Sequence, residues 1–487
     1  MNLTRPFFHH ARTRPDALAL IASDRRITYR ELAGLVLRAA AELGSRGVRP
    51  GDRVGLCLRD SPEHVVVLLA IASLGAVAVP LHWRAALGEI ERLAGALEIQ
   101  LALTEPDAAL KLRCQTLPVD ADWHRAVASR EPLQTLPDDW HAPLVIAATS
   151  GSTGAPKFNQ ATHLQFYCGL VGFLELFALS GRHRYLSTLP LYFSGGRLGL
   201  LAHLLRGDCV ILHGDLVNAR DFLQAAARTE ATVGFVVPSL LRELLATGDD
   251  QGLVRGLQRL VVGGSPLYAE EKRLARQKLS PNFCEMYGTA ETGPISLLQA
   301  QDIDAHADSL GQPHSLIEVE VVGDPGQALP AGESGLLRCR GPSLGTPLDV
   351  AGSAPNVGFR DGWYYTGEIA SLDELGFIHL AGRATELIMR GGAKIHPAEV
   401  EAVLQQHPDV LEAAVFGRRG VNNEEEVVAC VVGRGPPELS ALVAHCRAYL
   451  APTKRPQRIH VLAALPKNAS GKVDKQLLAQ RLMQQDK

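Results

Sequence analysis

The sequence lacks a hydrophobic run long enough to cross a membrane. The stretch Val65–Leu81 is mostly apolar, but it is shorter than the about 20 residues that a spanning helix needs, and small residues and a proline interrupt it. We expect a buried helix over Glu63–Leu74, a turn at Gly75 and a short strand over Ala76–Val79. The N-terminal segment also lacks the continuous apolar core of a signal peptide. These absences predict a cytoplasmic protein without a membrane span.

Paired cysteines and an excess of one charge are absent as well. The eight cysteines contain no C-x-x-C pair and are spaced too widely for a zinc site, so we interpret them as small core residues or free thiols in a reducing compartment. The formal net charge is −3, which gives no electrostatic argument for nucleic-acid binding. The chain has no internal repeat and no low-complexity segment, and its 46% hydrophobic and 21% charged residues are ordinary for a folded soluble protein.

What the sequence does have is an alternation of strand-like and helical segments up to about residue 300, which is typical of α/β units around parallel sheets. Its length of 487 residues predicts about three domains of average size. Thr28 and Glu31 have the spacing of a capping box at the start of a helix. Between Ile317 and Arg340, turns rich in proline and glycine join two strand-like segments. After Arg383 a new α+β pattern begins.

The most informative stretch is a loop rich in glycine and hydroxyl groups. Residues Thr149–Lys157 read T-S-G-S-T-G-A-P-K and follow the apolar run Leu144–Ala148, so a strand is expected to lead into a loop of small residues. Glycines let the backbone approach a ligand, and consecutive N–H groups form a concave anion site, to which Lys157 adds a charge suited to phosphate. The alternative is an ordinary polar loop. A P-loop of nucleoside triphosphatases is excluded, because Phe158 stands where that motif needs a hydroxyl residue.

Four further motifs follow in order along the chain. They are Y-G-T-A-E within Met286–Gly293, D-G-W-Y-Y-T-G-E over Asp361–Glu368, the segment Gly382–Glu401, which starts G-R-A-T-E, and L-P-K-N-A-S-G-K-V over Leu465–Val473. Together with the loop rich in glycine and hydroxyl groups, they resemble the signature motifs of the adenylate-forming enzymes. That family includes acyl-CoA synthetases, aryl-acid–CoA ligases and adenylation domains. The ordered set covers almost the whole chain, which makes the resemblance far more specific than any single motif.

The resemblance implies an α/β fold in two domains. The large N-terminal domain, residues 1–382, is expected to contain two α/β-layered sheets and a β-rich subdomain. A small mobile α+β C-terminal domain, residues 383–487, is expected to carry the catalytic lysine. The implied reaction has two steps: a carboxylate attacks the α-phosphate of ATP to give an acyl-adenylate, and a thiol then displaces AMP. ATP, Mg²⁺ and coenzyme A are the expected cofactors.

The resemblance also assigns roles to the first two motifs and to a loop between them. The residues expected to bind the phosphates are Thr149, Ser150, Gly151, Ser152, Thr153, Gly154 and Lys157. Tyr287 and Gly288 are expected to lie against adenine, Thr289 to bond the α-phosphate and Glu291 to support Mg²⁺. The loop of Gly263, Gly264 and Ser265 resembles the one whose backbone reads adenine and lines the acid pocket. Apart from the resemblance, the motif around Tyr287 is consistent with a plain turn between a strand and a helix.

Two positions depart from the usual pattern of the family. Glu368 stands where the family usually has an aspartate that holds both ribose hydroxyls, so the carboxylate reaches further by one methylene. A misplacement of about 1 Å can cost on the order of 100-fold in rate where positioning matters. Thr385 falls at the hinge about which the C-terminal domain is expected to rotate, where the family commonly has lysine or aspartate.

The last two motifs are expected to complete the site. Lys472 is the predicted catalytic residue, because a cation that bridges the attacking carboxylate and the phosphate stabilises the charge of the transition state. Arg383 is expected to contact the ribose or a phosphate, and Gly391 and Gly392 to lie near the path of the thiol. For Pro397–Glu401 the alternative is a helix start with proline in its first turn.

The acid pocket is expected along the segment L-P-L-Y-F-S-G-G-R. The residues predicted to line it are Tyr192, Phe193, Ser194, Gly195 and Arg197. The two aromatic side chains suit an apolar acyl or aryl group. We interpret Arg197 as a helix-surface arginine; the alternative is that it holds the second carboxylate of a dicarboxylic or succinylbenzoate-type acid. No side chain offers a carboxylate partner for an amino group, which argues against amino-acid activation.

The sequence therefore favours an AMP-forming acyl- or aryl-acid–CoA ligase, with a small carboxylic acid and CoA as its partners. One alternative is a stand-alone adenylating enzyme that loads a separate carrier protein, since no carrier domain follows Lys472. Another is a non-catalytic nucleotide-binding regulator, prompted by Glu368 and Thr385. The chain is expected to act as a monomer or a homodimer.

Overall fold

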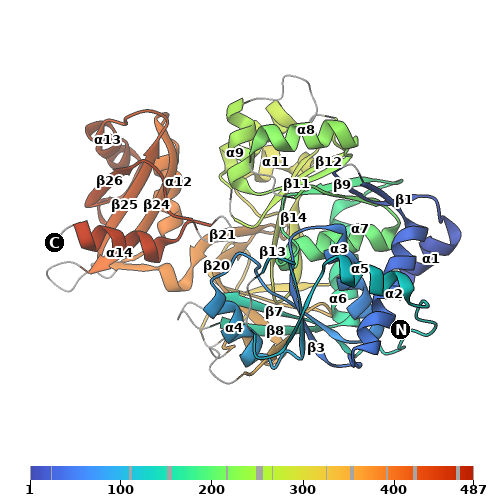
Figure 1. Ribbon diagram of the computed structural model, residues 1–487. Helices are drawn as coiled ribbons and strands as arrows, with labels where there is room; N and C mark the ends of the chain where they lie inside the picture. Colours follow the sequence, from blue (N-terminus) through green and yellow to red (C-terminus); the bar gives the residue numbers. More distant parts are fainter. Residues whose placement is uncertain are drawn as a thin grey trace.

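Two sheets form the framework of the large N-terminal domain (Figure 1). The first has nine strands in the order β15-β14-β13-β12-β11-β9-β10-β1-β2, and the second has seven in the order β18-β8-β7-β4-β3-β5-β6. The strands of the first sheet are β1 (Leu18–Ala22), β2 (Arg25–Thr28), β9 (Arg184–Ser187), β10 (Cys209–Leu212), β11 (Val233–Val236), β12 (Arg259–Gly263), β13 (Phe283–Thr289), β14 (Gly293–Leu298) and β15 (Gln312–Pro313). Those of the second are β3 (Arg53–Cys57), β4 (Val77–Pro80), β5 (Leu101–Thr104), β6 (Gln115–Pro118), β7 (Pro143–Ser150), β8 (Pro156–Thr162) and β18 (Thr346–Leu348).

The structure is a computed structural model that describes most of the chain. The described residues are 2–23, 25–108, 112–150, 156–214, 218–247, 256–265, 267–324, 326–350, 356–390, 393–419, 425–467 and 472–485. None of the helices in these ranges has the length and hydrophobicity of a membrane span.

The central strands of both sheets are parallel, as the alternation of segments predicts. In the first sheet β1, β10, β9, β11, β12 and β13 run in one direction, and β2, β14 and β15 are antiparallel additions at the edges. Loops that follow parallel strands emerge at the same edge of a sheet, and in open α/β sheets ligands bind outside these carboxyl ends. The loops after β9, β12 and β13 are three of the predicted site segments, so the topology brings them to one edge.

Four helices fill the space between the two sheets and share one core with both. They are α2 (Tyr29–Ser45), α3 (Pro62–Leu74), α6 (His163–Phe177) and α7 (Ser194–Arg206). Helix α3 is apolar on all sides because it is buried on all sides, as expected for a helix in the middle layer. It ends at Gly75 with φ of 72°, a left-handed conformation that glycine adopts without strain. The predicted capping box of Thr28 and Glu31 is confirmed at the start of α2.

The remaining helices of this domain cover its outside. They are α1 (Arg5–Thr13), α4 (Leu87–Ala96), α5 (Ala121–Ser129), α8 (Ala219–Thr229), α9 (Pro238–Thr247), α10 (Ala269–Leu274) and α11 (Ile303–His306). Helices α8, α9 and α10 lie on the outer face of the nine-stranded sheet and form a second core with it. The helix expected from Ala269 is regular only to Leu274 and continues as a π-helical turn over Ala275–Leu279.

Two local expectations need correction. The loop expected over Thr149–Lys157 is shorter, because Thr149 pairs with Lys157 and Ser150 with Pro156 in the antiparallel ladder of β7 and β8. The residues between them, 151–155, lie outside the described ranges. The motif around Tyr287 is a turn between two antiparallel strands, β13 and β14, and no helix follows it.

A third sheet and the small C-terminal domain complete the molecule. The third sheet is antiparallel, as expected for the β-rich segment, with β16 (Glu318–Val322), β17 (Gly335–Arg340), β19 (Phe359–Arg360), β20 (Trp363–Leu372) and β21 (Ile378–Arg383). The C-terminal domain contains β22 (Ile388–Arg390), β23 (Ala393–Ile395), β24 (Val410–Arg419), β25 (Glu425–Gly433) and β26 (Arg458–Leu462), with α12 (Pro397–Gln405), α13 (Leu439–Tyr449) and α14 (Lys475–Gln485). Its helices pack on the two faces of the β24-β25-β26 sheet in cores of their own.

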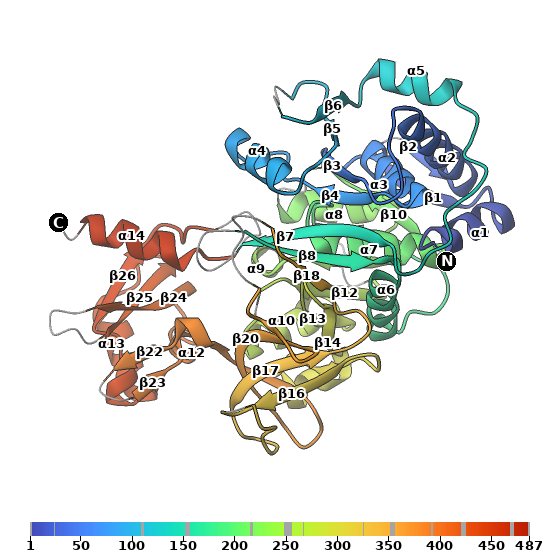
Figure 2. The ribbon, with the colours of Figure 1, turned by 90° about the horizontal axis from the view of Figure 1, so that it is seen from below.

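The C-terminal domain lies beside the large domain at the end where the active-site motifs gather. In Figure 2 the hairpin of β7 and β8 and the strand β20 lie on the side of the large domain that faces it. Helix α1 lies on the opposite side (Figure 1). The prediction of an α/β fold with a large N-terminal and a small α+β C-terminal domain is confirmed.

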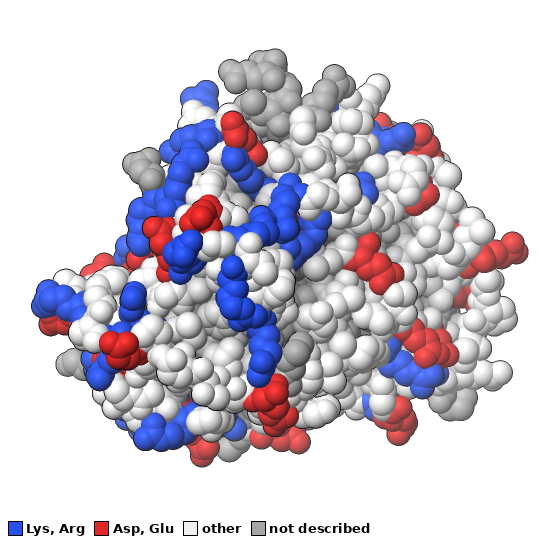
Figure 3. Space-filling view, turned by 90° about the vertical axis from the view of Figure 1, so that its right-hand side faces the viewer, with Lys and Arg blue, Asp and Glu red and all other residues white. Residues whose placement is uncertain are grey.

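Lysine and arginine side chains gather in a band over part of the face on the α1 side (Figure 3). Part of the positive charge near α1 has a structural use. Arg14 and Arg182 both donate to the carbonyl of Gly207, at the C-terminal end of α7, at 3.2 and 3.1 Å. Cations stabilise the carbonyl end of a helix, so these arginines are explained by the fold without a nucleic-acid partner.

Candidate active site

Segments from four parts of the chain meet around the Tyr287 side chain. The Tyr287 hydroxyl donates a short hydrogen bond to the Glu368 carboxylate on β20. Glu368 in turn lies opposite Arg383 in the ladder of β20 and β21. Both Tyr287 and Glu368 are half-buried among the surrounding strands. Burial raises the pKa of the Tyr287 phenol well above its ordinary value, and the Glu368 charge adds to the shift.

Burial also raises the pKa of the Glu368 carboxyl. The hydrogen bond from Tyr287 and the positive charges of Arg383 and Lys472 act in the opposite direction, but they do not cancel the effect of burial. A half-buried carboxylate with two cations near it suits a polar ligand, because the cations lower the free-energy cost of keeping the carboxylate ionised.

Glu291 is the second carboxylate of the site. It forms a side-chain hydrogen bond with the Tyr364 phenol, whose pKa is raised by burial and by the Glu291 charge. The Glu291 carbonyl accepts a hydrogen bond from Gly345 N at 2.9 Å, and the strand that follows, β18, pairs with β8. This chain of contacts links the turn after Tyr287 to the β7–β8 hairpin. The same turn is closed by Thr289, whose hydroxyl lies 3.0 Å from that of Thr292.

Lys472 reaches this site from the C-terminal domain. Val473, the residue after it, pairs with Lys467 in an isolated antiparallel bridge. Lys472 keeps contact with solvent, yet surrounding protein atoms and the charge of Arg383 lower the pKa of its amine, while Glu368 and Glu291 act to raise it. The structure thus brings the predicted Lys472, Glu291, Glu368 and Arg383 together, although they are up to 181 positions apart in the sequence.

The loop after β12 lies beside the same site. Gly263 is the register neighbour of Met286, the residue before Tyr287. A Cβ atom on Gly263 would lie 2.9 Å from the Met286 carbonyl oxygen, so only glycine allows this close approach. Gly264 has φ of 99°, and Ser265 is half-buried.

A buried ion pair holds the end of this loop. Glu285 accepts a hydrogen bond from Leu267 N at 3.1 Å and lies 2.5 Å from the Lys272 ammonium group. Lys272 also donates to the Ser309 carbonyl at 2.8 Å. Both charged residues are almost fully buried, and no local pattern in the sequence predicted either of them.

The residues predicted to line the acid pocket lie at the start of α7 and in the loop before it. The Tyr192 and Phe193 rings lie 4.3 Å apart, and the His82 ring meets the Tyr192 ring edge-on at 4.1 Å. Burial raises the pKa of the Tyr192 phenol to about 12. Tyr192 is therefore neutral and amphipathic, as expected for a wall facing an apolar group.

The interpretation of Arg197 as a helix-surface arginine is wrong. Its side chain is only 2% exposed, because the first turn of α7 packs against the loop before it. The guanidinium donates to the carbonyls of Leu191 and Tyr192 at 2.8 and 2.6 Å and contacts the Ser194 hydroxyl at 3.4 Å. Burial lowers the pKa of Arg197 to about 9. All of its hydrogen bonds go to this loop and the start of α7.

Some predicted residues lie outside the described ranges. They are Gly151, Ser152, Thr153, Gly154, Gly391 and Gly392. Thr149 and Ser150 lie at the end of β7, and Lys157 lies at the start of β8 with its side chain half-buried. Thr385 lies in a single turn of 3-10 helix, Ala384–Glu386, between β21 and β22. The alternative for Pro397 is also observed, since it is in the first turn of α12.

The site suits a nucleotide with its magnesium ion better than a metal held by protein alone. Within the described ranges no group of three or more His, Cys, Asp or Glu side chains could hold a metal ion. Mg²⁺ in nucleotide sites is bound through one or two carboxylates and the substrate phosphates. Glu291, whose backbone is linked to β8 through Gly345 and β18, is a carboxylate of this kind.

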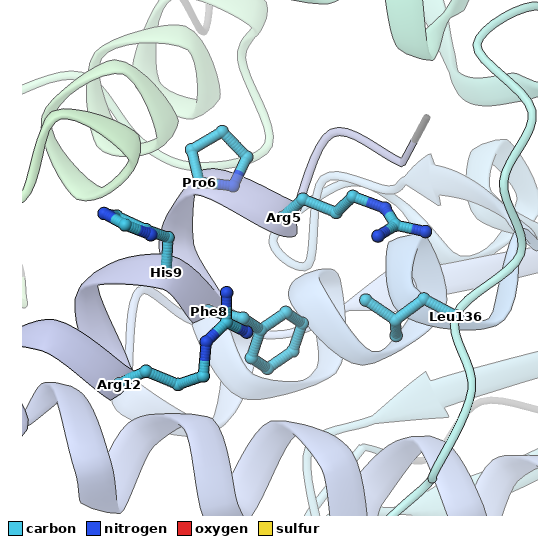
Figure 4. Close-up of a pocket in the computed structure, with 6 residues that line it drawn as sticks. All are labelled: Arg5, Pro6, Phe8, His9, Arg12 and Leu136. Atoms are coloured by element: carbon cyan, nitrogen blue, oxygen red, sulfur yellow. The ribbon is translucent and has the colours of Figure 1, made fainter.

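A surface hollow on α1 has no part in this site. It is lined by Arg5, Pro6, Phe8, His9, Arg12 and Leu136 (Figure 4). Arg5 lies 3.5 Å from Asp138 at its rim. Helix α1 lies on the side of the molecule away from the C-terminal domain (Figure 1), and we assign the hollow no function.

Comparison with known proteins agrees with this geometry. Residues 7–346 match the AMP-binding enzyme family, and residues 399–472 match the AMP-binding enzyme C-terminal domain. The chain is 31% identical to the indoleacetate–CoA ligase of Aromatoleum aromaticum over 98% of this chain and 97% of that one. It is 30% identical to the 2-succinylbenzoate–CoA ligase of Bacillus subtilis over 95% of each chain.

Solved structures of the Bacillus subtilis enzyme have the same fold. The complex with its acyl-adenylate intermediate superposes with a TM-score of 0.87 at 27% identity, covering 97% of each chain. The complex with ATP and a magnesium ion superposes with a TM-score of 0.85 at 28% identity, covering 96% of this chain and 98% of that one.

The chain belongs to the AMP-binding enzyme family. Within that family it is an AMP-forming acid–thiol ligase, which uses ATP to activate a carboxylic acid as an acyl-adenylate and transfers the acyl group to CoA.

Proposed function

We propose that the acid is an aryl or arylalkyl carboxylic acid, and that the residues gathered around Tyr287 bind the nucleotide and carry the first step. The observation that carries the proposal is the meeting of two carboxylates, Glu291 and Glu368, with two cations, Arg383 and Lys472. The substrate carboxylate and the α-phosphate are both anions, so the attack of one on the other needs cations where they meet. The metal ion and the ribose in turn need carboxylates in fixed positions.

In this proposal each group has a defined task. Glu368 hydrogen-bonds the ribose, Arg383 contacts the ribose or a phosphate, and Tyr287 lies against adenine. Thr289 bonds the α-phosphate, and Lys472 bridges the α-phosphate and the attacking carboxylate. The backbone of Thr149–Gly154 and the Lys157 ammonium group hold the leaving phosphates.

Glu291 would hold Mg²⁺, which when bound neutralises charge on the leaving pyrophosphate. The Tyr364 hydroxyl supports this role, because its hydrogen bond to Glu291 limits the orientations of the carboxylate. With one Glu291 carboxylate oxygen bound by the Tyr364 hydroxyl, the orientation of the other oxygen toward the metal is restricted.

Tyr192 and Phe193 support an aromatic acid. Offset or edge-on packing of rings adds about 0.5–1.5 kcal/mol beyond the burial of their area. The relatives reported above act, by name, on indoleacetate and 2-succinylbenzoate, two aromatic acids. Ser194 and Gly195, in the first turn of α7, complete the wall on this side.

The domain boundary is proposed at residues 382 and 383, with Thr385 as the hinge. Strand β21 still pairs with β20 of the large domain up to Arg383. Glu386, one residue after Thr385, is bound by Lys475 of α14 at 2.8 Å. The segment free to rotate is therefore short. Rotation would withdraw Lys472 and let the thiol approach past Gly391 and Gly392.

A cytoplasmic location is proposed on the state of the thiols. All eight cysteines are free, and six of them are buried. Free thiols persist in a reducing compartment.

The proposal is tested with purified enzyme, Mg-ATP, CoA and a panel of aryl, arylalkyl, fatty, branched and dicarboxylic acids. AMP and the masses of the CoA products are measured. We expect acyl-CoA from aryl or arylalkyl acids at the highest kcat/KM. Preference for a fatty acid would reject the substrate class, and an adenylate that forms without a CoA product would favour a carrier protein as acceptor.

A further inference from the structure

The loop Leu189–Phe193, which forms one wall of the proposed acid pocket, is held by two charged residues from different parts of the chain. Asp60 lies in the loop between β3 and α3, and both of its carboxylate oxygens accept from Leu191 N, at 3.0 and 3.2 Å. Arg197 donates to the carbonyl of the same residue, Leu191, at 2.8 Å and to the Tyr192 carbonyl at 2.6 Å. One peptide segment is thus bound on its N–H side by an anion and on its C=O side by a cation.

The cation has no carboxylate within hydrogen-bond distance in the described parts of the chain. Its Nε makes no hydrogen bond to any described residue. The nearby His64 is no counter-ion, because a histidine side chain is either neutral or positively charged; burial lowers its pKa to about 4 and keeps it neutral. A buried arginine held only by carbonyl and hydroxyl oxygens is expensive to bury, and replacement of buried charges by apolar groups is often neutral or stabilising. Stability is therefore a poor explanation for Arg197.

The geometry leaves little freedom for the loop. Phe193 N donates to the Pro190 carbonyl at 3.0 Å, which closes a turn around Leu191 and Tyr192. A Cβ on Gly196 would lie 2.2 Å from the same carbonyl oxygen, so the first turn of α7 lies directly against the loop. Displacement of the Leu191 peptide must move the Tyr192 and Phe193 rings, because their backbones adjoin it.

We infer that Asp60 and Arg197 are positioning residues that set the acid specificity by fixing Tyr192 and Phe193, and that neither touches the acid. The inference rests on the proposed function, in which these two rings line the acid pocket. It replaces the alternative in which Arg197 binds a second carboxylate of the acid.

The test compares Arg197→Met, Arg197→Lys, Asp60→Ala and Asp60→Asn with a matched control, Arg206→Met. Arg206 lies at the other end of α7 and also donates to two carbonyls, those of Leu179 and Gly181, at 2.9 and 2.7 Å. For each variant kcat and KM are measured for the preferred acid, for a smaller and a larger aryl acid, for a dicarboxylic acid and for ATP, together with the melting temperature.

We expect kcat/KM for the preferred acid to fall about 10- to 100-fold in Arg197→Met and Asp60→Ala, since misplacement by about 1 Å has effects of this size. KM for ATP should change less than about twofold. The differences in kcat/KM among the three aryl acids should become smaller than in the wild type. Asp60→Asn should recover most of the activity, because an amide oxygen can still accept from Leu191 N. Arg206→Met should keep the acid preference of the wild type.

Two results would overturn the inference. A loss confined to the dicarboxylic acid in the Arg197 variants, with Asp60→Ala unchanged, would make Arg197 a ligand of the substrate. Equal losses for acid and ATP, or the same change in Arg206→Met, would mean a general structural role. If Arg197→Met does not fold, Arg197→Lys and the Asp60 pair decide the question. Failure of the wild type to use any aryl acid would reject the proposed function instead.

Discussion

At the scale of single residues, the proposed nucleotide site differs from the family pattern by one methylene group. Glu368 stands where the family usually has an aspartate, and its longer side chain brings the carboxylate to the Tyr287 hydroxyl. The tyrosine thereby gives a buried carboxylate a hydrogen-bond donor within the protein, which lowers the free-energy cost of its charge. The glutamate at position 368 thus goes together with a hydrogen bond to Tyr287 that the sequence motif does not reveal.

This contact makes the pH dependence of ATP binding sensitive to Tyr287. The hydrogen bond from Tyr287 lowers the pKa of Glu368, so its removal in Tyr287→Phe raises that pKa further. Protonation then occurs at a higher pH, and an ATP site that needs the ionised carboxylate weakens at a higher pH. We expect the acidic limb of kcat/KM for ATP to shift to higher pH in Tyr287→Phe and to disappear in Glu368→Gln. An unchanged limb in Tyr287→Phe would separate Glu368 from ATP binding.

Lys472 should matter for the first step far more than other lysines of its loop. Loss of a preorganised charge contact in a transition state costs about 10²–10³ in rate. We expect Lys472→Ala to reduce acid-dependent exchange of pyrophosphate into ATP by that factor. The control is Lys467→Ala, which removes an ion pair with Glu412 at 2.7 Å on the surface. Similar losses in both variants would contradict the assignment.

At the scale of elements, the close approach of α7 to the preceding loop shapes the pocket. Gly196 and Gly195 are neighbours in the first turn of α7, but their surroundings differ. A Cβ on Gly196 would lie 2.2 Å from the Pro190 carbonyl oxygen, whereas one on Gly195 would lie 3.0 Å from a terminal methyl of Leu189. Backbone cannot move aside as a leucine side chain can.

Gly196→Ala should therefore be the more destabilising of two otherwise equal substitutions. Overpacking in a well-packed region typically costs about 1–3 kcal/mol. We expect Gly196→Ala to lower the free energy of unfolding by about this amount, measured by urea denaturation, and Gly195→Ala to lower it by less than half as much. Equal effects would mean that the loop and α7 separate more easily than their contacts indicate.

At the scale of the whole molecule, charged residues of the two domains face each other next to the active site. Arg242 and Tyr268 of the large domain lie in the electrostatic field of Glu412 of the C-terminal domain, and Tyr268 also in that of Glu401. Arg242 is itself paired with Glu271 at 2.6 Å. The arrangement places Lys472 at the carboxylates of the large domain.

Lys475 of the C-terminal domain joins α12 to the segment that holds the proposed hinge. Lys475 lies 2.8 Å from Glu386 and 2.9 Å from Glu401, and the Glu401 carboxylate also accepts from Val415 N at 2.7 Å. These carboxylates raise the pKa of Lys475 above its ordinary value, against the effect of burial. The stabilisation is therefore fully present at neutral pH and is lost only as the pH rises through the raised pKa.

Lys475→Met should lower the stability of the C-terminal domain, because two carboxylates lose their shared partner. Since the side chain of Lys475 is 23% exposed, we expect about 1–3 kcal/mol, at or below the range for a fully buried pair. Differential scanning calorimetry should show an earlier transition for this domain. The control Lys454→Met removes an exposed pair with Glu399 and should cost less than about 1 kcal/mol. Equal shifts of the transition temperature in Lys475→Met and Lys454→Met would contradict a special stabilising role for Lys475.

The sequence by itself determined the features that are local in the chain. The capping box of Thr28 and the largely apolar helix that ends at Gly75 follow from spacing and composition, because each depends on residues within a few turns. The alternation of strand and helix segments also indicated parallel central strands, although strands that pair, such as β1 and β10, lie far apart in the chain. The five ordered motifs likewise predicted the family and most of the residues now found around Tyr287.

Tertiary structure alone decided the contacts between distant segments. The Tyr287–Glu368 hydrogen bond, the hold of Asp60 on Leu191 and the burial of Arg197 involve groups that no pattern of nearby residues relates. Because arginine is charged, Arg197 was expected on the surface. The packing of α7 against the loop instead buries its side chain and directs its guanidinium toward two carbonyls. Which polar side chains are buried, and with which partners, depends on how the helices and strands pack. Packing joins residues that are far apart in the sequence, so local sequence patterns do not predict it.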